Sequence, residues 1–301
     1  MRLAKVLGGF GRVLIWTGVI ILLFVAYQLW GTNLAEARAQ DDLESEFEEL
    51  LVEAPEPDEP TSTSAPEDDS ETDTTTTAPE GLFEIPEPGQ AMARIEIPEI
   101  GVDKIVVEGV SRSDLKKGPG HYPDTPFPGQ SGNAAIAGHR TTYGAPFHRI
   151  DELGVDDEIT VTTLQGRFTY QVIGQEIVTP SDIHVIDDMD DDRLTLTSCH
   201  PKYSARQRII VSAVLVDEPA PPTPRGTREI DQAIETLDGE ETGPVAPVII
   251  FGLIALAVWL FFYVLSRKWR RWPAYALGVA PFGVALFVWF GAVAELLPSN
   301  F

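Results

Sequence analysis

Cysteine and basic residues are scarce in this sequence. One cysteine, Cys199, stands among 301 residues, so the chain cannot form an internal disulfide. Lys and Arg number 22 against 46 Asp and Glu, which gives a formal net charge of -24. Nucleic-acid binding relies on Lys and Arg clustered against phosphates, so this balance argues against a nucleic-acid partner. Residues 1–30 lack acidic side chains altogether, and Glu295 is the only one beyond Val245. The negative charge therefore lies in the middle of the chain.

Charged residues are almost absent from three long apolar runs, which predict transmembrane helices over residues 13–33, 245–265 and 273–297. Each run approaches the roughly 20 apolar residues that a helix needs to cross a bilayer. Pro281 in the third run is compatible with a lipid-spanning helix. Ala37-Arg38-Ala39 resembles a signal-peptide cleavage site, but the apolar run before it is longer than the core of most signal peptides. We therefore favour an uncleaved first span.

Basic residues flank these spans and predict their orientation. Residues 1–12 contain three Lys or Arg residues, and the short loop 266–272 contains four. By the positive-inside rule, both segments lie in the cytoplasm. The sequence thus predicts a multi-pass protein of the cell membrane, in contact with the lipid bilayer, whose middle part lies outside the cell.

The middle part divides by composition into two linkers and one domain. Residues 34–88 are rich in Glu, Asp, Pro and Thr and predict a disordered acidic stalk, in which only Leu43 to Val52 could form a short helix. Residues 219–244 predict a second linker with a stiff, Pro-rich start. Between them, residues 89–218 are about 130 residues long, which is the size of one compact domain.

Short β-rich runs dominate this domain and predict a mainly β fold. Clusters of Gly, Pro and Asp separate the runs, as expected of a β-barrel or sandwich. A helical turn is predicted over Asp182 to Ile186. The predicted strands cover residues 94–97, 104–107, 133–137, 159–163, 168–173, 176–178, 194–198 and 208–216.

The lone cysteine follows one of these strands. A free Cys is most often a small buried hydrophobe, and the alternative is a nucleophile. Alternation along the strand places Thr195, Thr197 and Cys199 on one face. Arg208 opens the next strand, and if the two strands form a hairpin, their backbones lie about 5 Å apart. Arg208 could then hold a positive charge and hydrogen-bond donors beside the thiol.

A histidine completes a set of residues suited to acyl transfer. His139 lies at the end of another short strand, after Gly138. Histidine moves protons near neutral pH, which a thiol nucleophile requires. Cys199, His139 and Arg208 would supply a nucleophile, an acid/base and an oxyanion stabiliser.

Three sequence blocks resemble sortases, in detail the class E sortases of actinobacteria. They are Gly118-Pro-Gly-His-Tyr-Pro, the run from Gly132 to Gly144 containing Ala-Gly-His-Arg, and Thr195-Leu-Thr-Ser-Cys-His-Pro followed by Arg208-Ile-Ile-Val. The resemblance covers residues 89–217 and implies an eight-stranded closed sortase-type barrel. It also implies catalytic roles for His139, Cys199 and Arg208. Ser198 stands where the family usually has Thr, so the hydroxyl is kept and a methyl is lost.

The resemblance also implies a reaction. Cys199 would attack the Thr–Gly bond of a C-terminal sorting signal, of the form Leu-Ala-x-Thr-Gly, on a surface protein. The thioester would then pass to an amine of a peptidoglycan precursor or a pilin lysine, and no cofactor would be required. Three alternatives stay open: a pilin-polymerising sortase, a hydrolytic cysteine peptidase, and a non-catalytic surface binding protein with a sortase-like barrel. The lid motif of pilin-polymerising enzymes usually contains Asp-Pro, and this sequence has no Asp-Pro dipeptide.

The remaining candidates lie around these blocks. Substrate contacts are expected from His121, Tyr122, Thr197, Ser198 and His200, although His121 and Tyr122 could equally hold a turn, and His200 could be structural or form part of a pocket wall. His148 and His184 are expected to be ordinary surface or packing residues. The acidic run Asp187 to Asp192 could attract calcium, but its spacing matches no familiar loop, so we favour a solvated loop. One Cys and scattered His residues predict no zinc site.

Overall fold

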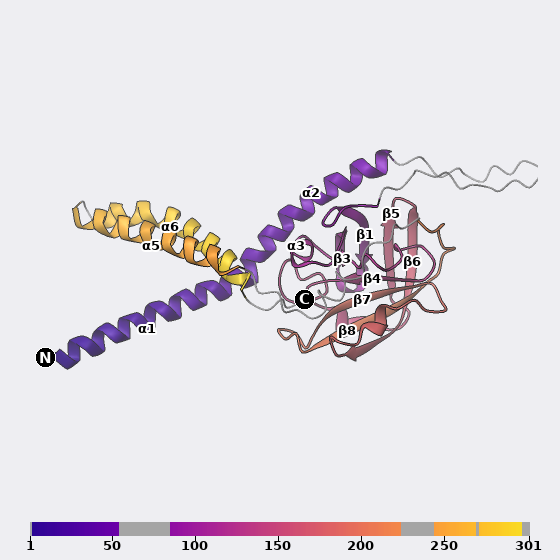
Figure 1. Cartoon of the computed structure of the whole chain (residues 1–301), viewed down its shortest axis with the longest axis horizontal. Helices are drawn as coiled ribbons and strands as arrows, with labels where there is room; N and C mark the ends of the chain where they lie inside the picture. Colours follow the sequence, from indigo (N-terminus) through magenta and orange to yellow (C-terminus); the bar gives the residue numbers. More distant parts are fainter. Residues whose placement is uncertain (1, 54–84, 224–243, 269–270, 297–301) are drawn as a thin grey trace, which may run out of the picture.

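The computed structural model describes residues 2–53, 85–223, 244–268 and 271–296. Its centre is a closed barrel of eight strands, as predicted (Figure 1). The strands are β1 (Ala91–Ile97), β2 (Val102–Glu108), β3 (Gly120–His121), β4 (Asn133–Ala137), β5 (Glu158–Thr163), β6 (Gly166–Val178), β7 (Arg193–His200) and β8 (Gln207–Leu215). Around the barrel they follow the order β1-β2-β3-β4-β7-β8-β6-β5.

Strand β4 lies beside the β7–β8 hairpin although it is far from both strands in sequence. β7 pairs in parallel with β4, from Asn133 opposite Arg193 to Ala137 opposite Thr197. On its other side β7 pairs antiparallel with β8. The ends of three strands therefore meet at one edge of the barrel.

The strand predictions are largely confirmed, with two differences. Residues 168–173 and 176–178 belong to one long strand, β6, whose register shifts between Val172 and Gly174. A bulge bends a strand without ending it, so Gly174 was a misleading boundary. The two-residue strand β3 was not predicted, because two residues show no periodicity.

Alternating side chains fill the barrel as the period of two requires. Leu194 and Leu196 of β7 lie in the main core, together with Ile95 and Ile97 of β1. Cys199 belongs instead to a small cluster on the other face of β7, with Ala135, Ala137 and Tyr122 among its members. The predicted separation of the two faces of this strand is confirmed.

Short helical segments cover the connections. The 3-10 segments are η2 (Pro98–Ile100), η3 (Ile150–Glu152) and η4 (Ile183–Ile186), and a capped α-helical turn forms α3 (Arg112–Leu115). The turn predicted over Asp182 to Ile186 is confirmed at η4.

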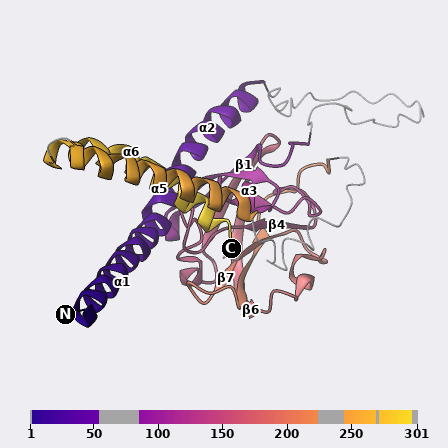
Figure 2. The same cartoon turned by 60° about the vertical axis from the view of Figure 1, so that its left-hand side comes forward.

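Three apolar helices lie outside the barrel. They are α1 (Arg2–Ala26), α5 (Val245–Lys268) and α6 (Arg271–Ala294), and each is part of a helix long and apolar enough to cross a membrane. Figures 1 and 2 show α1 and the α5–α6 pair leaving the barrel on the same side. Near the barrel the helices touch, because the rings of Phe24 and Phe290 lie 5.3 Å apart.

Residues 34–53 of the predicted stalk are helical, so the short helix expected at Leu43 to Val52 is present but begins much earlier than predicted. A short π-helical segment, η1 (Tyr27–Gly31), leads from α1 into helix α2 (Thr32–Glu53), which runs along the barrel beside β1 (Figure 2). Leu43 and Phe47 are buried against Ala91, Ile105 and Val107. Burial of one apolar stripe stabilises the helix despite its acidic composition. The rest of the predicted stalk, residues 54–84, and residues 224–243 of the second linker lie outside the described residues.

Candidate active site

The cysteine and the arginine lie directly opposite each other in the β7–β8 hairpin. Cys199 pairs with Arg208 in the register of the two strands. Nη1 of Arg208 lies 3.6 Å from the Cys199 sulfur, within the range of a hydrogen bond to sulfur. The same nitrogen donates to the backbone oxygen of Ala205 at 3.1 Å, which fixes the guanidinium in place. A permanent cation therefore stands beside the thiol, as the hairpin prediction required.

The thiol itself is buried and protonated at neutral pH. Cys199 is 1% exposed. Burial raises the pKa of its thiol to about 11, although the nearby charges of Arg208 and Arg140 act to lower it. A buried thiolate lacks solvating water, and the two guanidinium groups favour the ionised form. The sulfur becomes a good nucleophile when a base removes its proton.

The histidine lies on the other side of the cysteine strand. The register between β4 and β7 is constant, and extending it by two residues beyond Ala137 and Thr197 brings His139 level with Cys199. The Gly138 amide donates to the Thr197 carbonyl at 3.1 Å, so the pairing continues past the end of β4. Residues level with each other in parallel strands point to the same face. Cys199 is therefore flanked by His139 on one side and by Arg208 on the other.

A second arginine, which sequence reasoning missed, supports the histidine loop. Arg140 is 1% exposed and donates to the Cys199 backbone oxygen at 2.9 Å and to the His148 backbone oxygen at 3.0 Å. It also forms an ion pair of 2.7 Å with Asp151. Arg140 thus ties the residue after His139 to the backbone of the cysteine. Its position beside His139 was visible in the sequence, but its partners depend on the loop fold.

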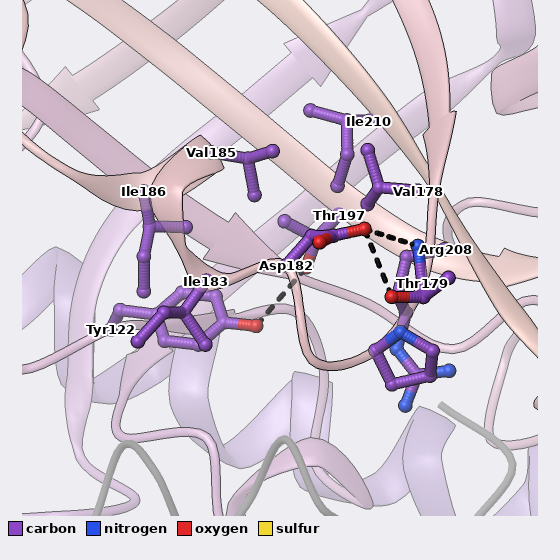
Figure 3. A pocket seen from close by; sticks show the side chains of 11 residues that line it. Tyr122, Val178, Thr179, Asp182, Ile183, Val185, Ile186, Thr197, Arg208 and Ile210 are labelled. Carbon is purple, nitrogen blue, oxygen red and sulfur yellow. Dashed lines mark hydrogen bonds between the residues drawn. The ribbon is translucent and has the colours of Figure 1, made fainter.

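A small pocket lies beside the arginine (Figure 3). Tyr122 and Thr197 line it, and their hydroxyl groups lie 3.3 Å apart. Their contact with substrate stays a prediction. The other lining residues come mainly from the end of β6 and the segment after it. The full set is Tyr122, Val178, Thr179, Pro180, Asp182, Ile183, Val185, Ile186, Thr197, Arg208 and Ile210. Most of the exposed lining of this pocket is apolar.

Two of the residues expected to contact substrate, His121 and Ser198, form hydrogen bonds within the protein instead. His121 is fully buried, with Nδ1 at 2.8 Å from the Glu108 carboxylate and Nε2 at 2.9 Å from the Pro126 oxygen. Ser198 is 1% exposed, and its hydroxyl donates to the Gly138 carbonyl at 2.7 Å. Neither placement suits a direct contact with substrate. His121 holds a turn, which was the alternative interpretation, and Ser198 ties β7 to the residue before His139.

His200, another of the expected substrate contacts, ends strand β7. It pairs with Gln207 in the β7–β8 hairpin and is only partly buried. Its Nδ1 is buried without a hydrogen-bond partner among the described residues. The adjacent residue Cys199 belongs to the cluster that contains Tyr122, and strand neighbours point to opposite faces. A wall or packing role for His200 stays a prediction.

The acidic run before β7 is partly engaged in local contacts. Asp191 pairs with Arg193, which lowers the pKa of the Asp191 carboxyl. Asp192 accepts a hydrogen bond of 2.9 Å from the Gly132 amide. Over residues 2–53, 85–223, 244–268 and 271–296, no three or more His, Cys, Asp or Glu residues are grouped to hold a metal ion. The solvated loop stays a prediction.

Comparisons with known proteins point to one family. Residues 95–216 match the family described as Sortase domain. Sortase SrtE1 of Streptomyces coelicolor is 32% identical over 225 residues, covering 69% of this chain and 56% of that protein. Sortase D of Bacillus subtilis is 38% identical over 117 residues, covering 38% of this chain and 58% of that protein. This chain therefore spans less than two thirds of the length of either relative.

A solved structure is similar over the barrel. Sortase E from Streptomyces avermitilis shares 39% sequence identity, covering 44% of this chain and 91% of that chain, with a TM-score of 0.40. Sequence similarity to SrtE1 and the family match agree on the region that contains Cys199, His139 and Arg208. The chain belongs to the sortase family through its domain over residues 95–216.

Proposed function

We propose that this protein is a membrane-anchored cysteine transpeptidase that cleaves a sorting signal and joins the cleaved protein to an amine. One observation carries the proposal: Nη1 of Arg208 lies 3.6 Å from the sulfur of Cys199, opposite it in β8. The register of β4 and β7, extended by two residues, supports a place for His139 on the other side of Cys199. A nucleophile, a proton carrier and a fixed cation on three adjacent strand ends suit acyl transfer. The membership of the sortase family supports the same reaction.

The chemistry follows from these positions. His139 accepts the proton of Cys199, and the sulfur attacks the Thr–Gly carbonyl of the signal. Arg208 donates hydrogen bonds to the oxyanion of the tetrahedral intermediate. The C–N bond then breaks, and His139 gives its proton to the departing amine. The remaining thioester is attacked by a second amine, which releases Cys199 and forms a new amide.

The pocket beside Arg208 supports an apolar residue in the signal. Its walls include Val178, Ile183 and Ile210, and Arg208 stands at its edge (Figure 3). An aliphatic side chain in the pocket would bring the downstream Thr–Gly bond towards the thiol. From the resemblance to class E sortases, we propose a signal of the form Leu-Ala-x-Thr-Gly on surface proteins, with a peptidoglycan precursor amine or a pilin lysine as acceptor.

The membrane arrangement is proposed as multi-pass, with the barrel outside the cell. The N-terminal end of α1 and the adjoining ends of α5 and α6 extend away from the barrel on one side (Figure 1). Both ends carry the basic residues of the segments 1–12 and 266–272. The positive-inside rule puts these ends in the cytoplasm, and the barrel then lies beyond the outer face.

The test is a ligation assay on the full chain in detergent micelles. A Leu-Ala-x-Thr-Gly peptide and triglycine serve as substrates, and mass spectrometry follows the products. We expect a ligated peptide with the wild type, and at least about a hundredfold less with Cys199→Ala, His139→Ala or Arg208→Ala. Tyr203→Phe, at an exposed side chain, is the matched control and keeps full activity.

Other outcomes separate the alternatives. Cleavage that yields only hydrolysed peptide, even at high amine concentration, would favour a cysteine peptidase. Ligation to a lysine-containing pilin peptide but not to triglycine would favour a pilin-polymerising enzyme. If the folded chain reacted with neither Leu-Ala-x-Thr-Gly nor Leu-Pro-x-Thr-Gly, the non-catalytic binding protein would gain support.

A further inference from the structure

The loop that follows His139 has an unusual backbone. Tyr143, Gly144 and Ala145 have φ angles of 49°, 73° and 44°, so three consecutive residues are left-handed. Two of them carry a Cβ, for which this region is unfavourable. Such a conformation persists only where surrounding contacts hold it in place. The loop is therefore expected to depend on its neighbours.

The same loop contacts the imidazole. The ring of Tyr143 lies 5.1 Å from the ring of His139, with an angle of 32° between their planes. The Phe147 amide donates to the His139 backbone oxygen at 3.2 Å, so the loop folds back on the histidine. Any shift of Tyr143 would change the packing of the His139 ring. The position of the proton carrier is thus coupled to the loop.

Helix α2 holds the loop through its first two residues. The Tyr143 amide donates to Oγ1 of Thr32 at 3.3 Å, and the Gly144 amide donates to Oδ1 of Asn33 at 3.0 Å. Thr32 is fully buried, and its hydroxyl donates to the Gln28 carbonyl at 2.8 Å. Two left-handed residues therefore have their amides satisfied by side chains at the end of the first predicted span.

The fit between helix and loop is close. A Cβ at Gly144 would lie 2.4 Å from the Glu36 carboxylate, so only glycine allows this approach. Glu36 is itself fixed, because it is buried and forms an ion pair of 2.6 Å with Lys104 of β2. The start of α2 is thus locked onto both the barrel and the loop.

We infer that Thr32 and Asn33 are positioning residues for His139. They hold the Tyr143–Gly144 backbone, which keeps the Tyr143 ring against the imidazole. Both residues lie where the chain leaves the first predicted span, so the junction between anchor and barrel completes the active site. The anchor then does more than tether the enzyme: it sets the geometry of proton transfer. The effect on activity rests on the proposed function, whereas the effect on the His139 ring does not.

The kinetic test uses the full chain in detergent micelles and the double variant Thr32→Val/Asn33→Ala, which lacks both acceptor atoms. We expect kcat for ligation to fall roughly tenfold, since positioned proton transfer contributes a factor of about 10² to 10⁴, with KM within about twofold of wild type. Thr32→Ser/Asn33→Asp keeps both acceptors and should restore kcat. Glu44→Gln is the matched control: Glu44 lies on the same helix, well beyond Asn33, where it contacts Arg94 and has no role in the loop contacts. It should leave kcat unchanged.

A spectroscopic test does not require turnover. The ring current of Tyr143 shifts the His139 imidazole proton signals, which can be assigned in the full chain with labelled histidine by their loss in His139→Gln. We expect these signals to move towards unstacked values in Thr32→Val/Asn33→Ala and to return in Thr32→Ser/Asn33→Asp. Unchanged imidazole signals in the double variant, or an equal change in Glu44→Gln, would overturn the inference. If the His139 imidazole signals moved in the double variant but the wild type showed no ligase activity, the inference about His139 would be supported and only the proposed function refuted.

Discussion

At the scale of single residues, the environment of Cys199 has opposing effects on the ionisation of its thiol. Burial suppresses its ionisation, and Arg208 and Arg140 partly offset that effect. A protonated resting thiol resists modification, and the flanking cation and imidazole suit it to react once substrate arrives. The thiol of Cys199 is therefore expected to react slowly with other reagents in the absence of substrate.

The pH dependence of thiol alkylation tests this view. A pKa raised to about 11 leaves the thiol protonated at pH 7, so the rate of reaction with iodoacetamide should climb about tenfold per pH unit from pH 7 to 9.5. Cys199 is the only cysteine, so mass spectrometry reads the site directly. Arg208→Gln should lower the rate at each pH, because it removes a charge that favours the thiolate. A rate that levels off below pH 8 would show that the resting thiol is already ionised.

The raised pKa of Cys199 also makes the stability of the folded state depend on pH. Because the folded-state pKa of Cys199 lies above its ordinary value of 9.0, the buried thiol favours the folded state fully below pH 9. That contribution is lost as the pH rises from 9 through about 11, where the unfolded chain ionises first. Alkylation is therefore best measured below pH 9.5, where the fold keeps most of this contribution.

At the scale of elements, helix α2 is held by a small apolar cluster. Phe47 is 2% exposed and packs with Leu43 against β1 and β2. At its middle, the Gln40 side chain binds the backbone of Ile105 through two hydrogen bonds, of 2.8 and 3.0 Å. Docking of α2 thus combines apolar burial with a side chain that pairs with the edge of β2.

Truncating Phe47 should loosen α2 from the barrel. Phe47→Ala removes a buried ring, which costs about 3 kcal/mol. Hydrogen exchange in the full chain should show a drop of this size in the free energy of opening of the α2 amides, with the core strands unaffected. Leu51→Ala is the matched control, because Leu51 is 39% exposed, and should change protection by less than about 0.5 kcal/mol. Equal losses in both variants would mean that α2 is not docked through Phe47.

The sequence predicted the elements of the site better than the contacts that support them. Alternation and hairpin geometry were enough to place Cys199 opposite Arg208, because the period of a strand is fixed. Only a short helix over Leu43 to Val52 was expected within α2, because the acidic composition outweighed the spacing of Leu43 and Phe47, four residues apart on one helical face. The burial of His121 could not be foreseen either, since its partners Glu108 and Pro126 come together only when the barrel closes.

At the scale of the whole molecule, the ends of α1 and α6 meet the barrel at one junction. Tyr27 stacks edge to face with Phe287 at 4.9 Å, and Lys116, next to α3, pairs with Glu295 at 3.2 Å. Arg112 donates to the Glu295 backbone oxygen at 3.0 Å. The ends of α1 and α6 therefore lie beside the barrel and beside the start of α2. An anchor fixed at several points restricts how the barrel can turn relative to the membrane surface.

This arrangement makes a prediction about topology that two single-cysteine variants can test. In a Cys199→Ser background, Val155→Cys places a thiol on an exposed loop of the barrel, and Lys268→Cys places one at the exposed end of α5. A membrane-impermeant maleimide should label Val155→Cys in intact cells, and should label Lys268→Cys only after the cells are permeabilised. The basic residues around Lys268 disfavour its transfer across the membrane, whereas the proposed function requires the barrel to lie outside. Labelling of Lys268→Cys in intact cells would show that the α5–α6 pair has the opposite orientation. Glu295 would then lie on the cytoplasmic side, where it could not pair with Lys116 of a barrel outside the cell.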